Sequence, residues 1–157
     1  MVQLIVIDIA VVVAVSILIG ALAPRTPRAW LAADVGPLTL LPAESSSTYR
    51  RWHVTTLARR LPELGELFGG SSKGSLSGST PDDLSAYLVE VRRGEWVHWA
   101  SIAASTVLFA FNPWWLALSF VALVAAGNLP FILVLRNNRL RIRDILRRNG
   151  QRRDGTG

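Results

Sequence analysis

The chain has 157 residues, of which 50% are hydrophobic and 18% are charged, whereas an average soluble domain has about 25% charged residues. It has no cysteine and only two histidines, which excludes disulfides, thiol chemistry and a metal site built from several histidines. The net charge of +6 resides in residues 136–157, which hold eight arginines and two aspartates. An apolar body with one basic end is typical of a membrane protein and not of a nucleic-acid binder.

Residues 2–23 form an apolar run that is long enough, at about 33 Å as a helix, to cross a bilayer. A cleaved signal peptide is the alternative, because Ala21-Leu22-Ala23 resembles a cleavage site. However, no basic residue precedes the run and Pro24 would follow the cut, so we favour a retained helix. Asp8 is expected near the outer interface, with a partner helix or a polar cavity as the alternative.

Residues 24–93 are expected to be interfacial and cytoplasmic. Pro24 to Thr48 is too apolar for solution and too rich in proline to span a membrane, and Tyr49 to Leu61 has the pattern of an amphipathic interfacial helix. Residues 69–80 predict a flexible Gly/Ser loop. A helix is then predicted to begin at Pro81, with Thr80 as its N-cap, and to run straight toward Trp96.

Residues 94–135 predict a transmembrane hairpin. The Asn112-Pro113 dipeptide is a turn signal and separates two apolar helices, Trp96–Phe111 and Trp114–Leu135, with tryptophans near their ends. Asn128 and Pro130 are expected to interrupt the second helix. The remainder, 136–157, is predicted to be a basic tail that suits an anionic membrane surface.

The arginines predict the orientation. They are absent before residue 24 and from the hairpin turn, so the positive-inside rule places the N-terminus outside and both the middle segment and the C-terminus in the cytoplasm. The predicted fold is therefore an all-α, multi-pass cell-membrane protein with three transmembrane helices and interfacial amphipathic helices.

The densest polar cluster lies where the hairpin begins. On a helix Glu90 lies beside Arg93, and Glu95 beside His98, because each pair is three residues apart. A carboxylate next to an imidazole suits a general base, so the sequence nominates His98 and Glu95 as catalytic residues. The alternative, a buried polar pair that ties two helices together, is equally compatible with the spacing.

A second polar cluster follows on the last helix. Arg136 and Arg139 are candidates for binding phosphate or carboxylate, and the alternative is a positive-inside signal. Asn128 and Asn138 are the better indicators of a site, because a buried amide needs partners.

These two clusters carry a family resemblance. The run Glu90-x-x-Arg93-x-Glu95-x-x-His98-Trp99, followed by the turn at Asn112-Pro113, resembles the E-T-x-R-A-E-x-x-H-W motif of the glycosyl-4,4'-diaponeurosporenoate acyltransferase family. The ending Asn128-x-Pro130…Arg136-x-Asn138-Arg139-x-Arg141 resembles that family's N-x-P…R-Y-N-R-x-R, with Asn137 in place of the tyrosine. Upstream, Leu61-Pro62-Glu63 is similar to its L-P-[DE], although the Trp-Lys pair usual before it is Leu57-Ala58 here.

The resemblance implies a small integral membrane enzyme that moves a fatty acyl group to a sugar hydroxyl of a glycosylated carotenoid. Carried over, it nominates His98 and Glu95 as catalytic, and it nominates as substrate-binding the residues Glu90, Arg93, Asn128, Arg136, Asn138 and Arg139. No cofactor and no metal are expected. The expected partners are membrane lipid, an amphiphilic glycolipid acceptor, an acyl donor such as acyl-CoA and possible further copies of the chain.

Two alternatives stay open at this point. The acceptor is a different envelope glycolipid, or the chain is a non-catalytic membrane subunit or assembly factor that binds a glycolipid or a larger enzyme. The small size and the lack of a nucleophile keep the second alternative in play.

Overall fold

The computed structural model describes residues 1–60 and 80–154, and this part of the chain is helical without any strand. The all-α prediction is confirmed for these residues. The elements in chain order are α1 (Val2–Leu22), η1 (Ala23–Arg25), η2 (Arg28–Leu31), η3 (Gly36–Leu38), α2 (Ser46–Arg51), α3 (Val54–Arg60), α4 (Pro81–Ser105), η6 (Thr106–Ala110) and α5 (Trp114–Asp154).

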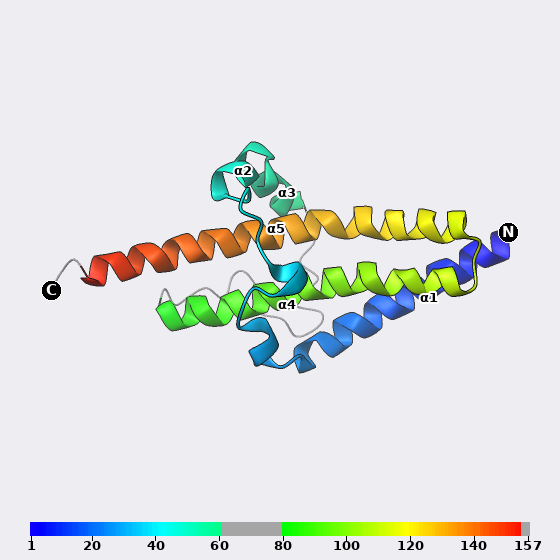
Figure 1. Ribbon diagram of the computed structural model, residues 1–157, viewed down its shortest axis with the longest axis horizontal. Coiled ribbons are helices and arrows are strands. Elements are labelled where there is room, and N and C mark those ends of the chain that lie inside the picture. Colours follow the sequence, from blue (N-terminus) through cyan, green and yellow to red (C-terminus); the bar gives the residue numbers. More distant parts are fainter. Residues whose placement is uncertain (61–79, 155–157) are drawn as a thin grey trace.

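A long antiparallel hairpin of α4 and α5 forms the centre of the molecule (Figure 1). As predicted, α4 begins at Pro81 with Thr80 as its cap, since the Thr80 hydroxyl accepts a hydrogen bond from the Asp83 amide at 3.2 Å. The helix then continues without a break past Trp96. The predicted turn at Asn112-Pro113 separates it and the short η6 from α5.

The second helix of the hairpin is longer than predicted. Hydropathy placed its end at Leu135 and an interruption at Pro130, whereas α5 has 41 residues and includes Pro130. Arginines therefore continue the same helix instead of starting a separate tail. Outside the apolar stretch, the two helices stay together through a small core of Leu84, Leu88, Val91 and Ile142.

The remaining elements lie on opposite faces of the hairpin. In Figure 1, α1 lies on one side and crosses α4, while α2 and α3 lie over α5. The chain between them, residues 31–44, crosses α4 and α5, and we call it the strap. Tyr49 of α2 and Val54 of α3 pack with Val134 and attach this pair of helices to α5.

The predicted amphipathic helix at 49–61 is two short helices. His53 separates α2 from α3 and has a φ of 53°, a left-handed conformation that ends a right-handed helix. Leu61 and the predicted Gly/Ser loop, except Thr80, lie outside the described residues. Whether α2 and α3 rest on a membrane surface stays a prediction.

α1 contacts the hairpin at its turn. The Asn112 side-chain amide donates to Asp8 Oδ1 at 2.8 Å, and Asp8 is fully buried. The contact with Asn112 gives Asp8 a polar partner outside its own helix, and its expected position near the outer interface stays a prediction.

Among the described residues, two helices are long and apolar enough to cross a membrane: the stretch Val2–Arg25, which includes α1, and Trp114–Arg148 of α5. Only 11% of the apolar window in each is buried, unlike the core helix of a soluble protein, so these helices are consistent with a membrane protein. α4 does not meet this test, because charged residues occupy its first half. A third span stays a prediction.

Candidate functional site

The imidazole of His98 and the amide of Asn128 meet across the hairpin. His98 lies on α4 and Asn128 on α5, with His98 Nδ1 2.7 Å from Asn128 Oδ1. Phe131, three residues after Asn128 and therefore on the same side of α5, stacks on the imidazole with ring centroids 4.9 Å apart and planes 14° apart. The ring is thus held both at one edge and on one face.

The amide of Asn128 determines the tautomer of His98. Its Nδ2 donates to the Val124 carbonyl at 2.8 Å, which assigns the Asn128 oxygen to the side that faces His98. An amide oxygen only accepts hydrogen bonds, so His98 Nδ1 carries the proton. Neutral His98 therefore has its lone pair on Nε2, which is the state of a proton acceptor.

Glu95 has other partners than the sequence predicted. Its Oε1 accepts from Arg136 Nε at 2.8 Å and from the Trp99 indole at 3.4 Å, and its Oε2 accepts from Arg139 Nη1. The expected hydrogen bond between Glu95 and His98 is not formed. His98 contacts Asn128 instead, and Glu95 contacts Arg136 and Arg139. Glu95 and Arg139 are both completely buried, so this pair is a structural connection between α4 and α5.

The strap completes this ionic cluster. Asp34 contacts Arg92 at 2.8 Å, Arg139 at 2.5 Å and Arg143. Glu44 contacts Arg136 at 2.8 Å. The cluster therefore combines three carboxylates from the strap and α4 with four guanidiniums from α4 and α5, namely Asp34, Glu44, Glu95, Arg92, Arg136, Arg139 and Arg143.

The arginines also bind the backbone of the strap. Arg136 Nη2 donates to the Pro37 carbonyl at 2.6 Å, and Arg139 Nη2 donates to the Leu38 carbonyl at 2.7 Å. Arg92 donates to the Leu31 carbonyl at 3.2 Å. The strap has 3-10 turns and no sheet partner, so these guanidiniums satisfy carbonyl groups that would otherwise be buried without a hydrogen bond.

Charge and burial oppose each other at the strap carboxylates. Burial raises the pKa of Asp34, but Arg139, Arg92 and Arg143 outweigh this effect and lower it below 3.8. Burial likewise raises the pKa of Glu44, and hydrogen bonds from Tyr49 and Arg136 lower it below 4.5. Tyr49 stays protonated, because burial and the adjacent Glu44 raise its pKa, and it donates to Glu44 at 2.6 Å.

Arg93 and Glu90 form a separate pair. As the spacing predicted, they contact each other, with Arg93 Nη1 2.5 Å from a Glu90 carboxylate oxygen. Arg93 Nε is buried and has no partner among the described residues. Asn138 is half-buried, and within residues 1–60 and 80–154 its side chain makes no hydrogen bond to His98 or to the ionic cluster.

The structure thus brings together Glu95, Arg136 and Arg139 in one cluster and His98 with Asn128 in another contact. It adds Asp34, Glu44, Arg92 and Arg143, which the motifs did not nominate. A sequence signal for the first two exists, because they are the only acidic residues between residues 24 and 48. Isolated acids in an apolar, proline-rich segment need a buried or interfacial partner.

No group of acidic residues or histidines able to hold a metal ion occurs within residues 1–60 and 80–154. At this position an oriented imidazole lies near a buried cluster of ion pairs. Arg93, with its unpartnered Nε, is the one nominated arginine outside that cluster.

Comparison with known proteins identifies the family. No curated protein and no solved structure matches the chain. A family described as CrtO, glycosyl-4,4'-diaponeurosporenoate acyltransferase, matches residues 27–148. This match begins after α1 and contains the strap, the His98–Asn128 contact and the whole ionic cluster. The chain therefore belongs to the CrtO family of glycosyl-4,4'-diaponeurosporenoate acyltransferases.

Proposed function

We propose that this protein is a membrane acyltransferase that moves a fatty acyl group from a thioester donor, such as acyl-CoA, to a sugar hydroxyl of a glycosylated carotenoid or a similar glycolipid. The family supports the reaction class. The observation that supports the site is the His98–Asn128 hydrogen bond, because it leaves Nε2 unprotonated on a ring that is fixed in place.

In this mechanism His98 Nε2 accepts the proton of the sugar hydroxyl while the hydroxyl oxygen attacks the acyl carbonyl carbon. The carbon–sulfur bond of the thioester then breaks, and His98 returns the proton to the departing thiolate. Ester and free thiol are the products, and the imidazole is neutral again, so a single base serves both proton transfers. A general base of this kind contributes about 10²- to 10⁴-fold to the rate.

The other nominated residues divide into two groups in this proposal. Glu95, Arg136 and Arg139 are positioning residues, because their charged atoms contact one another and the strap. Arg93 is the candidate for an anionic group of the acyl donor, since it lies outside the ionic cluster and its Nε has no partner in the described part of the chain. Asn128 orients His98, and Glu90 holds Arg93 in place.

The test is mass spectrometry of lipid extracts from cells without the protein and from cells that contain the wild type or His98→Ala. We expect an acylated glycolipid with the wild type and its loss with His98→Ala at equal amounts of membrane-inserted protein. The matched control is His53→Asn, which changes the other histidine at an exposed position and tolerates its positive φ. Full acylation by His98→Ala, or lipids unchanged by the wild type, would contradict the enzyme and favour a non-catalytic subunit.

A further inference from the structure

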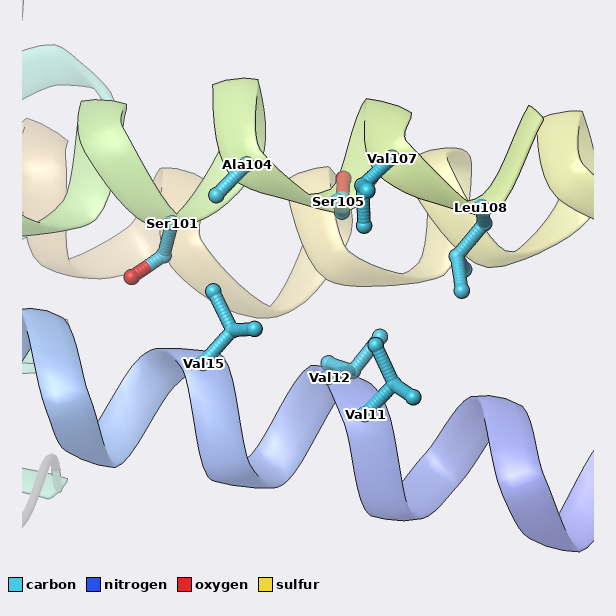
Figure 2. Close-up of a pocket in the computed structure, with 8 residues that line it drawn as sticks. All are labelled: Val11, Val12, Val15, Ser101, Ala104, Ser105, Val107 and Leu108. Carbon is cyan, nitrogen blue, oxygen red and sulfur yellow. The ribbon is translucent and has the colours of Figure 1, made fainter. Parts of the chain in front are cut away.

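The apolar parts of three helices lie at one level of the molecule. α1 packs along the second half of α4, where Val12 and Val15 lie across a seam from Ala104 of α4 and Leu108 of η6 (Figure 2). α5 runs beside the same part of α4 in the hairpin, and its last turns, orange to red in Figure 1, extend beyond the end of α1. A bilayer that surrounds α1 therefore leaves this end of α5 outside its hydrocarbon core.

The continuous course of α5 carries its last turns away from the membrane. If the hydrocarbon core ends near Arg136, Arg141 lies about 8 Å and Arg148 about 18 Å farther along the helix axis. The headgroup layer on each side of the core is only about 5–8 Å thick. The helix therefore places Ile145 and Arg148 in water beyond the headgroups.

One exposed side of this part of α5 is basic, with an apolar residue in its middle. Arg141, Ile145 and Arg148 follow one another at spacings of four and three residues, so they lie on the same side of the helix, and we call them the stripe. All three are exposed, Ile145 with 43% of its surface. Neither arginine of the stripe forms an ion pair with a residue in the described ranges, whereas the adjacent Arg147 contacts Asp144 at 3.6 Å.

The stripe has the features of a protein-binding surface. Arginine is enriched in protein interfaces, which combine an apolar centre with a polar rim. Small-molecule sites are concave, and a small nucleotide on the convex surface of one helix would stay largely exposed to water. Guanidiniums without acidic partners in their own chain favour a partner that supplies carboxylates.

We propose that the stripe docks an acyl carrier protein, a small acidic protein that holds the acyl group as a thioester on a pantetheine arm. The inference rests on the proposed function and specifies its acyl donor. Arg141 lies about 20 Å beyond Asn128 along α5, and Asn128 contacts His98, so a donor on the stripe needs a long arm to reach the imidazole. The acyl carbon bonds to the sugar oxygen as its bond to sulfur breaks, and the carrier leaves with a free thiol that has received the proton from His98.

The experiment compares palmitoyl acyl carrier protein with palmitoyl-CoA as donors for the full chain in membranes that contain the acceptor. Arg148→Gln removes one charge from the stripe, and the matched control Arg147→Gln removes the same charge one position away. With the carrier donor, we expect kcat/KM to fall about threefold in Arg148→Gln and about tenfold in Arg141→Gln/Arg148→Gln. Both variants should retain the wild-type value with palmitoyl-CoA, and Arg147→Gln should retain it with both donors.

Two results of this comparison count against the carrier protein. Equal losses with the two donors would assign the stripe to a group that both donors share. Wild-type values with both donors would show that the stripe takes no part in donor binding. Either result overturns the inference.

A binding measurement without turnover separates this inference from the proposed function. The anisotropy of fluorescently labelled acyl carrier protein is recorded with the full chain in phosphatidylcholine nanodiscs. Binding that weakens in Arg148→Gln and not in Arg147→Gln supports the docking even if no acyl transfer is detected, in which case the proposed function alone fails. Absence of binding, or equal binding by the two variants, overturns the docking.

A label on the stripe tests the lipid surface as the other occupant. The chain has no cysteine, so Ile145→Cys accepts a single fluorophore, and Leu123→Cys, at an exposed position in the apolar part of α5, is the control. In nanodiscs that contain phosphatidylglycerol, we expect iodide in water to quench the label at 145 and brominated lipids to quench the label at 123. Quenching of the label at 145 by the brominated lipids would place the stripe on the membrane and overturn the inference.

Discussion

The single hydrogen bond between His98 and Asn128 defines which nitrogen of the imidazole is free to act. Replacing Asn128 with Leu removes the acceptor of the Nδ1 proton, and the ring then loses its preference for that tautomer. We expect kcat to fall about 10- to 100-fold with KM little changed. Nitrogen-15 NMR of labelled histidine in a His53→Asn background reports His98 alone.

In that spectrum the His53→Asn parent protein should show His98 protonated at Nδ1. Addition of Asn128→Leu should increase the fraction of His98 that is protonated at Nε2. Asn128→Asp retains an acceptor oxygen and should restore the parent tautomer. Identical spectra for the parent and Asn128→Leu would show that Asn128 does not orient the ring.

In this structure the contacts of Glu95 indicate that it stabilises the fold. Glu95→Gln leaves Arg139 fully buried with one carboxylate fewer, and removal of one partner from a buried ion pair costs about 3–5 kcal/mol. The control is Glu90→Gln in the more exposed pair with Arg93, for which about 0–1 kcal/mol is expected. Thermal unfolding in detergent measures both.

A Glu95→Gln protein that is as stable as the wild type but inactive would instead assign Glu95 to the chemistry. The two alternatives that helical spacing left open, a catalytic pair or a structural connection, are thereby separated by one measurement. The structural connection is the one that the contacts of Glu95 favour.

Residues on the same helix could be paired from the sequence, and residues far apart could not. The spacing of three predicted the Glu90–Arg93 contact, and that prediction is confirmed. The same rule suggested Glu95 with His98, but arginines 41 and 44 positions later take that carboxylate. Helical periodicity shows which side chains share a face, and it does not show what the next helix presents to that face.

At the scale of elements, we expect the attachment of the strap to depend on pH. The folded state lowers the pKa of Asp34 and Glu44 from 3.8 and 4.5, so their ion pairs stabilise the fold above these values. That stabilisation is lost as the pH falls below these values, through the lowered pKa values of the folded state. We expect residues 31–44 to become accessible to protease only in this more acidic range, while α4 and α5 stay helical.

Limited proteolysis at a series of pH values, with an acid-active protease, measures this release. Asp34→Asn removes one titrating group and should make the strap accessible already at neutral pH. A strap that is equally protected at pH 7 and at about pH 1–2, where both carboxylates are protonated, would contradict their role.

The continuity of α5 shows what hydropathy can and cannot predict about an element. The apolar stretch and the turn at Asn112 were apparent, because each is a local property of the sequence. The helix end was not, because α5 continues where it packs against the charged half of α4 through Leu88, Val91 and Ile142. Tertiary packing of an amphipathic face extends a helix beyond its apolar run.

For the molecule as a whole, the length of α5 places the hairpin turn and the ionic cluster about one bilayer thickness apart. Trp114 and Arg136 are 22 residues apart, or about 33 Å along a helix, which is close to the thickness of a bilayer core. If α5 crosses the membrane, the hairpin turn lies near one surface, and the ionic cluster with the strap lies near the other. The positive-inside rule predicts that the second surface is the cytoplasmic one.

Single-cysteine labelling tests this orientation, because the chain contains no cysteine of its own. A cysteine at Ser72, in the segment between α3 and α4, should be protected from an impermeant thiol reagent in intact cells and react after lysis. A cysteine at Phe111, an exposed residue at the hairpin turn, should react in intact cells. The opposite pattern would reverse the topology.

The contact between Asp8 and Asn112 has a consequence for biosynthesis, since 104 positions separate its partners. At about 5–20 residues per second, Asn112 leaves the ribosome about 5–20 s after Asp8. During this interval the first helix carries a carboxyl group that has not yet met its amide. Until the amide arrives, this carboxyl group needs another polar partner, such as water at the membrane surface. Final docking of α1 follows the synthesis of the hairpin turn.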